Sequence, residues 1–130
     1  MRVVFDTNVY VSALTLPKGS AAQALDRIVT GEHELFLSKP ILDELLGVLA
    51  RKFARDREEL ARVALFLSEL ATIVGSKRRL RVLVDDADNR VLECGVAARA
   101  DAIVTGDKQM LKLGSYGDLR IMAIRQFLNS

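Results

Sequence analysis

The sequence predicts an α/β fold with a mostly parallel sheet. Short runs of β-forming apolar residues alternate with amphipathic helical segments, an order typical of strand–helix–strand units. The chain has 130 residues, half of them apolar, which is enough for one domain with a hydrophobic core. We find no internal repeat, low-complexity tract or linker, so residues 1–130 are expected to form a single domain.

The N-terminal half begins with the apolar run Val3-Val-Phe5, which is typical of a strand buried on both faces. A helix from Ser20 follows, with its apolar stripe on one side and Gly31 just past its end. Asp56 and Glu59 form a capping-box pattern that starts another helix. The expected elements are a helix over 9–14, a helix over 20–30, a strand over 34–37, a helix over 38–53 and a helix over 56–74.

The C-terminal half repeats the alternation. Its clearest strand is the apolar run Ala102-Ile-Val-Thr105, which ends at Gly106-Asp107. Gly95 lies on the inward stripe of the preceding helix, where we expect close contact between helix and sheet. The expected elements are a strand over 79–84, a helix over 88–99, a strand over 102–105, a short helix reaching 113, a strand over 119–122 and a helix over 123–128.

Composition excludes several classes of protein. Cys94 is the only cysteine and there is one histidine, so neither a disulfide framework nor an ordinary zinc site is expected. No apolar run approaches the ~18 residues of a membrane span, and no secretory leader precedes the first strand. We therefore expect a cytoplasmic protein. The net charge of +2 does not by itself indicate a nucleic-acid-binding protein.

Two aspartates follow strands directly. Asp6 comes after Val3-Val-Phe5, and Asp107 comes after the strand over 102–105. Ligands of open parallel sheets bind outside the carboxyl ends of the strands, so both carboxylates are placed where a functional site is expected. Each is equally well explained as a helix cap.

Two more carboxylates are placed by helical phase. Glu44 shares the stripe of Ile41, Leu45 and Val48, whereas Asp43 lies on another side of the helix. Asp88 begins the inward stripe of its helix. A carboxylate on a buried stripe is costly unless it is paired or bound to a metal. The ordinary alternatives are a position at the rim for Glu44 and an N-cap for Asp88.

Taken together, four elements bring Asp6, Glu44, Asp88 and Asp107 to one edge of the sheet. Such carboxylates repel one another unless a divalent cation lies among them. Mg²⁺ and Mn²⁺ prefer oxygen ligands, and one or two ions can activate water and stabilise charge on a phosphodiester. Asn8, Thr105 and Asp85 are expected to hydrogen-bond the ligands or their waters, although Thr105 is also an ordinary strand residue.

Four segments in this order resemble the PIN-domain family, closest to VapC-like toxin components of toxin–antitoxin systems. They are Val-Phe-Asp6-Thr-Asn8, Pro40-Ile-Leu-Asp-Glu44, Asp85-Asp-Ala-Asp88-Asn89-Arg-Val-Leu-Glu93-Cys and Ile103-Val-Thr105-Gly-Asp107-Lys-Gln-Met-Leu111. The resemblance continues to the final Ile124-Arg-Gln-Phe127-Leu128 and so covers nearly the whole chain.

The resemblance implies a three-layer α/β/α sandwich and a Mg²⁺- or Mn²⁺-dependent endoribonuclease that hydrolyses single-stranded RNA. The family's acidic quartet maps onto Asp6, Glu44, Asp88 and Asp107, and its Ser/Thr onto Thr105. The third acid is open among Asp85, Asp86 and Asp88, and Asn89 stands where shorter members place theirs. The resemblance also implies a homodimer and a cognate antitoxin.

The helix expected over 57–74 carries two neighbouring apolar stripes. One stripe contains Leu60 and Leu67, and the other contains Phe66 and Leu70. A helix that is apolar on two sides needs two surfaces to cover it, so we expect a homodimer or antitoxin contact there. A helix sandwiched within the monomer is the alternative.

For RNA we expect contacts from Lys108, Arg90 and the basic run Lys77-Arg-Arg-Leu-Arg81. Two tyrosines and no tryptophan leave few stacking platforms, so binding through backbone phosphates should dominate and be sensitive to salt. The ordinary reading of such a basic run is a solvated surface.

Other functions fit the pattern less well. A phosphatase of the haloacid dehalogenase type needs an acid two residues after the first aspartate, where this chain has Asn8. A response-regulator receiver needs a phosphoacceptor on a central strand and a downstream lysine in another order. A catalytically silent PIN module that acts through dimer or antitoxin binding, and an RNA-processing nuclease that is not a toxin, are alternatives within the family.

Overall fold

Six strands form one sheet in the order β3-β2-β1-β4-β6-β5. A computed structural model describes residues 1–130. The strands are β1 (Arg2–Phe5), β2 (Glu34–Leu37), β3 (Thr72–Ile73), β4 (Ala102–Val104), β5 (Ser115–Tyr116) and β6 (Leu119–Met122). All neighbouring pairs are parallel except the β5–β6 hairpin. The carboxyl ends of β1 and β4 therefore meet at the same edge.

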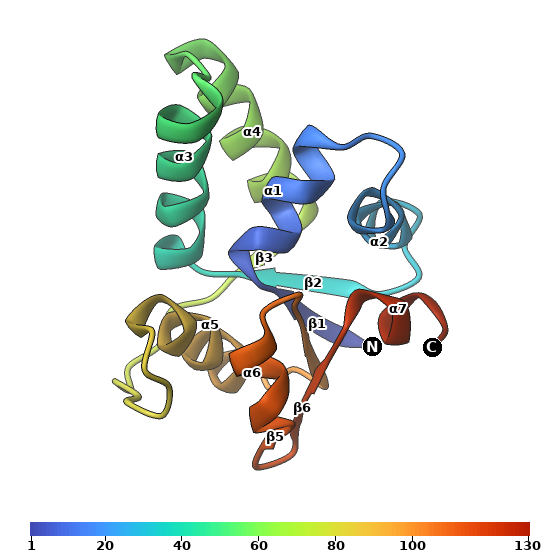
Figure 1. The fold of residues 1–130 in the computed structure, drawn as a ribbon, viewed down its shortest axis with the longest axis vertical. Coiled ribbons are helices and arrows are strands. Elements are labelled where there is room, and N and C mark those ends of the chain that lie inside the picture. Colours follow the sequence, from blue (N-terminus) through green and yellow to red (C-terminus); the bar gives the residue numbers. More distant parts are fainter.

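Helices cover both faces of this sheet. They are α1 (Thr7–Thr15), α2 (Ser20–Val29), α3 (Lys39–Phe53), α4 (Arg57–Leu70), α5 (Asp86–Ala97), α6 (Lys108–Leu113) and α7 (Ile124–Leu128). Figure 1 shows α1 and α2 on one side and α5 and α6 on the other, with α3 and α4 standing out as a pair. The expected α/β fold, a central sheet flanked by helices, is confirmed. No helix combines the length and the apolar character needed to cross a membrane.

The central strands are the most deeply buried part of the chain. The apolar residues of β1 and β4 are completely excluded from solvent. Helix α5 packs on these strands and on β2. A Cβ at Gly95 would come within 2.7 Å of Leu119 Cδ2, so this glycine permits the close approach that the sequence indicated. The tight contact sets the last turn of α5 close against β4 and the start of β6.

The predicted strand over 79–84 is wrong. These residues form an irregular segment, and the edge of the sheet beside β2 is occupied by β3 instead. The predicted helix over 56–74 is accordingly too long, because α4 ends at Leu70. Thr72, Ile73 and Val74 are β-branched and favour extended backbone. Side chains of α5 take the backbone hydrogen bonds that a sheet neighbour would have supplied to residues 80–83.

Candidate active site

Thr105 joins the ends of the two central strands. Its hydroxyl donates a buried hydrogen bond of 2.7 Å to Asp6 Oδ2, and it accepts one of 3.0 Å from the backbone N–H of Asp107. The backbone N–H of Asp6 donates to the Val104 carbonyl at 2.9 Å. These bonds fix the Asp6 carboxylate at the sheet edge and bring Asp107 to the same place.

Asp6 is the most enclosed of the acids, with 4% of its surface exposed. Burial raises the pKa of Asp6 above its ordinary value; the hydrogen bonds from Thr105 and the Thr7 backbone oppose this, and the charges of Asp107 and Asp85 add to it. Two acids from other elements therefore lie near enough to repel Asp6.

Asp88 lies in the first turn of α5 and is 7% exposed. Burial raises the pKa of Asp88 to about 7, aided by the close carboxyl of Asp107 and by the negative charges of Asp6, Asp107 and Asp85. Asp88 is thus closely associated with the acids that follow β1 and β4. Its predicted inward position is confirmed, and the N-cap of α5 is Asp85 instead.

Glu44 is half-buried in the second turn of α3. Burial raises the pKa of Glu44, and the charges of Asp6 and Asp85 raise it further, whereas the nearby Thr7 hydroxyl and Arg51 lower it. The Thr7 hydroxyl is buried and makes no hydrogen bond of ordinary geometry. The structure therefore brings all four predicted carboxylates, together with Asp85, to one edge of the sheet.

The five carboxylates are close enough to influence one another, but they do not form a finished ligand sphere. No three acidic, histidine or cysteine side chains are gathered tightly enough to hold a metal ion as they stand. Asp85 and Asp107 each use one oxygen as a helix cap, at 3.0 Å from Ala87 N and 2.9 Å from Gln109 N. Side-chain rotation would have to bring their free oxygens together around an ion.

Two other predicted residues lie beside this edge. Asn8 and Lys108 are exposed and line a shallow cleft together with Asp107. Asn8 lies beside Asp107, and its predicted hydrogen bond to the ligands or their waters stays a prediction. Lys108 forms no ion pair within 4.0 Å, so its ammonium group is available to an anion near Asp107.

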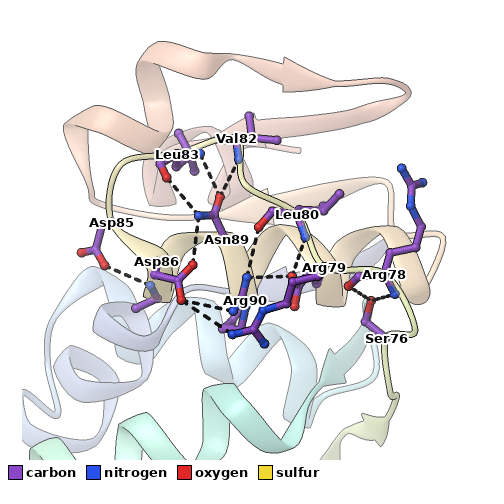
Figure 2. A network of polar contacts seen from close by, with 12 residues as sticks. Ser76, Arg78, Arg79, Leu80, Val82, Leu83, Asp85, Asp86, Asn89 and Arg90 are labelled. Carbon is purple, nitrogen blue, oxygen red and sulfur yellow. Dashed lines mark hydrogen bonds and ion pairs between the residues drawn. The ribbon is translucent and has the colours of Figure 1, made fainter.

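Arg90 is held within the fold by acids of its own helix, and its predicted contact with RNA stays a prediction. Its guanidinium pairs with Glu93 at 2.8 Å and Asp86 at 3.2 Å, and it donates to the Leu80 carbonyl at 3.1 Å. Only 11% of its side chain is exposed. Figure 2 shows this network together with Asn89, whose amide holds residues 82 and 83. The sequence did not predict that Asn89 and Glu93 hold the backbone of residues 80–83. Their spacing of four residues, which places both on one face of the helix, was the available signal.

The chemistry of the site follows from its donors. All the converging groups are carboxylates, with a hydroxyl from Thr105 supporting one of them. Hard dications such as Mg²⁺ and Mn²⁺ favour this all-oxygen set over nitrogen or sulfur ligands. Burial, together with the charges of neighbouring carboxylates, raises the pKa values of Asp6, Glu44 and Asp88. A bound dication or added protons would each relieve the repulsion.

Comparison with solved structures supports the fold. VapBC2 from Rickettsia felis, solved bound to a DNA fragment from their promoter, has a TM-score of 0.70 and 18% identity, covering 95% of this chain and 98% of the other. VapBC-1 from nontypeable Haemophilus influenzae has a TM-score of 0.67 and 14% identity, covering 96% and 99%. At these identities the likeness concerns the fold alone.

Sequence comparison identifies the family. An uncharacterized protein of Methanocaldococcus jannaschii is 29% identical over 117 residues, which are 87% of this chain and 75% of that protein. The PIN domain profile matches residues 2–109, a span that contains β1, β4 and every carboxylate of the acidic cluster. On this evidence the chain belongs to the PIN-domain family.

Proposed function

We propose that this protein is a metal-dependent endoribonuclease that hydrolyses single-stranded RNA and is the toxin of a toxin–antitoxin pair. PIN domains are generally nucleases, and PIN nucleases typically use divalent metal ions. The observation that carries the proposal is the convergence of Asp6, Glu44, Asp88 and Asp107 at one sheet edge, where each of the first three has a raised pKa. Such a cluster is costly in the fold and is useful when a cation occupies it.

The roles of the residues follow from their positions. Asp6, Glu44, Asp88 and Asp107 would hold one or two Mg²⁺ or Mn²⁺ ions. When bound, the metal would activate water and stabilise negative charge on the phosphodiester, so that a phosphorus–oxygen bond to ribose is hydrolysed. Thr105 fixes the orientation of Asp6 through the 2.7 Å hydrogen bond. Lys108 is placed to neutralise a phosphate beside Asp107.

The outer surface of α4 supports the expectation of a protein partner. Leu65 and Phe66 are 61% and 41% exposed on neighbouring positions, while Leu67 on the other side is fully buried. An apolar patch of this kind favours association. The two VapBC structures share the fold, so we propose a second copy of the chain or a cognate antitoxin as the partner of this surface.

Cleavage assays on assorted single-stranded RNAs test the function. The parent protein should cut with Mg²⁺ or Mn²⁺ and stop in EDTA, and Asp6→Asn and Asp107→Asn should lose at least ~100-fold in rate while staying folded. Asp43→Asn is the matched control, because Asp43 is exposed on α3 and pairs with Lys39 at 2.7 Å. Cutting that persists in EDTA or in Asp6→Asn would contradict the proposal. A parent protein that cuts nothing with either metal would favour the silent PIN module.

A further inference from the structure

Residues 76–85, which we term the strap, cross the start of α5 without joining the sheet. Their backbone is held by side chains of that helix (Figure 2). The Asn89 amide accepts from Val82 N at 3.0 Å and Leu83 N at 2.8 Å, and it donates to Leu83 O at 2.9 Å. Glu93 accepts from Leu80 N at 2.7 Å. The strap is therefore fixed in place although it has no secondary structure.

The strap turns two valines toward solvent. Val82 is 41% exposed and Val84 is completely exposed, whereas Leu80, which also belongs to the strap, is buried. Because Asn89 holds the backbone at residues 82 and 83, the valines cannot fold back onto the core without breaking those hydrogen bonds. Their exposure is thus a fixed property of the strap, and it forgoes the free energy that burial would provide.

These valines line a cleft that is also lined by three of the acids, Asp85, Asp88 and Asp107. The cleft has a volume of about 540 Å³, which is within the range of small-ligand sites. One wall is Val82, Leu83 and Val84; the rest consists of Asp85, Asp88, Asp107 and Gln109. No cationic or aromatic side chain lines it. The side-chain amide of Gln109 forms no hydrogen bond within the protein and is exposed, so it can reach a ligand.

The charges determine which part of an RNA strand fits beside the valines. The valine wall offers a phosphate neither a cation nor a side-chain hydrogen-bond donor, whereas a nucleobase is neutral and has apolar faces that can pack on it. Phosphates of the flanking nucleotides are better placed in a second cleft of about 450 Å³, whose lining residues include Lys39, Lys77, Arg78 and Arg79. The strap thus lines a basic cleft with its first residues and an apolar and acidic cleft with its last ones.

We propose that the cleft between the strap and α6 receives the nucleobase next to the cleaved phosphodiester, with Val82 and Val84 packing on the base and Gln109 hydrogen-bonding its edge. The proposal rests on the proposed ribonuclease function and names the part of its substrate that gives sequence preference. Aliphatic side chains take the role that aromatic platforms fill elsewhere. Gln109 supplies the donor and acceptor that distinguish one base from another.

Val84→Ser and Gln109→Ala test this assignment, with Val29→Ser as the matched control. Val84 and Val29 are both exposed valines, and Val29 ends α2 away from the acids. Each protein is incubated with Mn²⁺ and a random-sequence single-stranded RNA pool, and the cut sites are sequenced. We expect Val84→Ser to lower kcat/KM about five- to tenfold and Gln109→Ala to change the base preferred beside the cut. Val29→Ser should match the parent.

Oligouridylate substrates, each with one abasic position, separate the base from the backbone. When the abasic position is next to the cut, kcat/KM of the parent should fall by a factor similar to the one expected for Val84→Ser on the intact strand. On this abasic substrate, Val84→Ser should have the same kcat/KM as the parent. Unchanged sites and rates in both variants would overturn the inference while the ribonuclease function stands. A parent that cuts no RNA would overturn both. If Val84→Ser instead turns a dimer into a monomer in sedimentation, the valines contact a second copy and the inference is wrong.

Discussion

Replacing Asp88 by asparagine should make the metal-free protein more stable above pH 7. The fold buries Asp88 beside Asp107, Asp6 and Asp85, which raises its pKa from 3.8 to about 7. The folded state therefore favours the protonated form more strongly than the unfolded chain does. Below about pH 4 the Asp88 carboxyl is protonated in both states and does not affect stability. As the pH rises from there to about 7, Asp88 increasingly lowers the free energy of unfolding. Asparagine carries no charge and avoids the penalty.

The size of the effect follows from the two pKa values. A difference of one in pKa corresponds to ~1.4 kcal/mol, so the full difference between the folded and unfolded pKa values of Asp88 would lower the free energy of unfolding by roughly 4 kcal/mol. The acidic cluster lies at an edge that water and salt reach, and screening reduces such interactions. We therefore expect Asp88→Asn to gain about 2 kcal/mol in the free energy of unfolding near pH 8, and little near pH 4.

Urea unfolding of both proteins in EDTA at the two pH values measures this difference. Asp43→Asn should behave like the parent at each pH, because Asp43 is exposed and paired with Lys39. Adding Mg²⁺ at the higher pH should stabilise the parent more than Asp88→Asn, since only the parent retains the full ligand set. An Asp88→Asn protein that is less stable than the parent near pH 8, or a difference that does not change with pH, would show that the Asp88 charge does not destabilise the fold.

Three further predictions concern the strap and the surface. Asn89→Ala removes three hydrogen bonds to the strap and should lower the free energy of unfolding by about 2 kcal/mol. Amide hydrogen exchange at Val82 and Leu83 should become faster. Unchanged exchange at these residues would contradict the attachment of the strap by Asn89. Phe66→Asp should shift the protein toward monomer in sedimentation; a parent that is already monomeric and an unaltered variant would contradict the partner surface. RNA affinity should fall as the salt concentration rises, and Arg78→Ala should reduce the slope of log affinity against log salt concentration by about one.

The acidic cluster was predictable because two rules of chain geometry converge on it. Parallel strands bring Asp6 and Asp107 to the same edge whatever the loops do, and helical phase turns Glu44 and Asp88 toward that edge. The caps at Asp85 and Asp107 show that cap and site interpretations do not exclude each other, because a carboxylate has two oxygens.

The strap was not predictable by the same rules. Leu80, Val82 and Val84 alternate with other residues in the pattern of a half-buried strand, and only tertiary contacts decide against it. Glu93 and Asn89 satisfy the backbone from the helix side, and the sheet edge is taken by Thr72–Ile73. Local propensity cannot tell which of two extended segments pairs with β2 when both are short.

Titration of Mn²⁺ into the protein near pH 8, with free Mn²⁺ measured by electron paramagnetic resonance, shows directly whether these acids gather to bind a hard dication. We expect saturable binding of one or two ions per chain, greatly weakened in Asp6→Asn and in Asp107→Asn and retained in Asp43→Asn. No saturable binding by the parent, or equal binding by all four proteins, would contradict it.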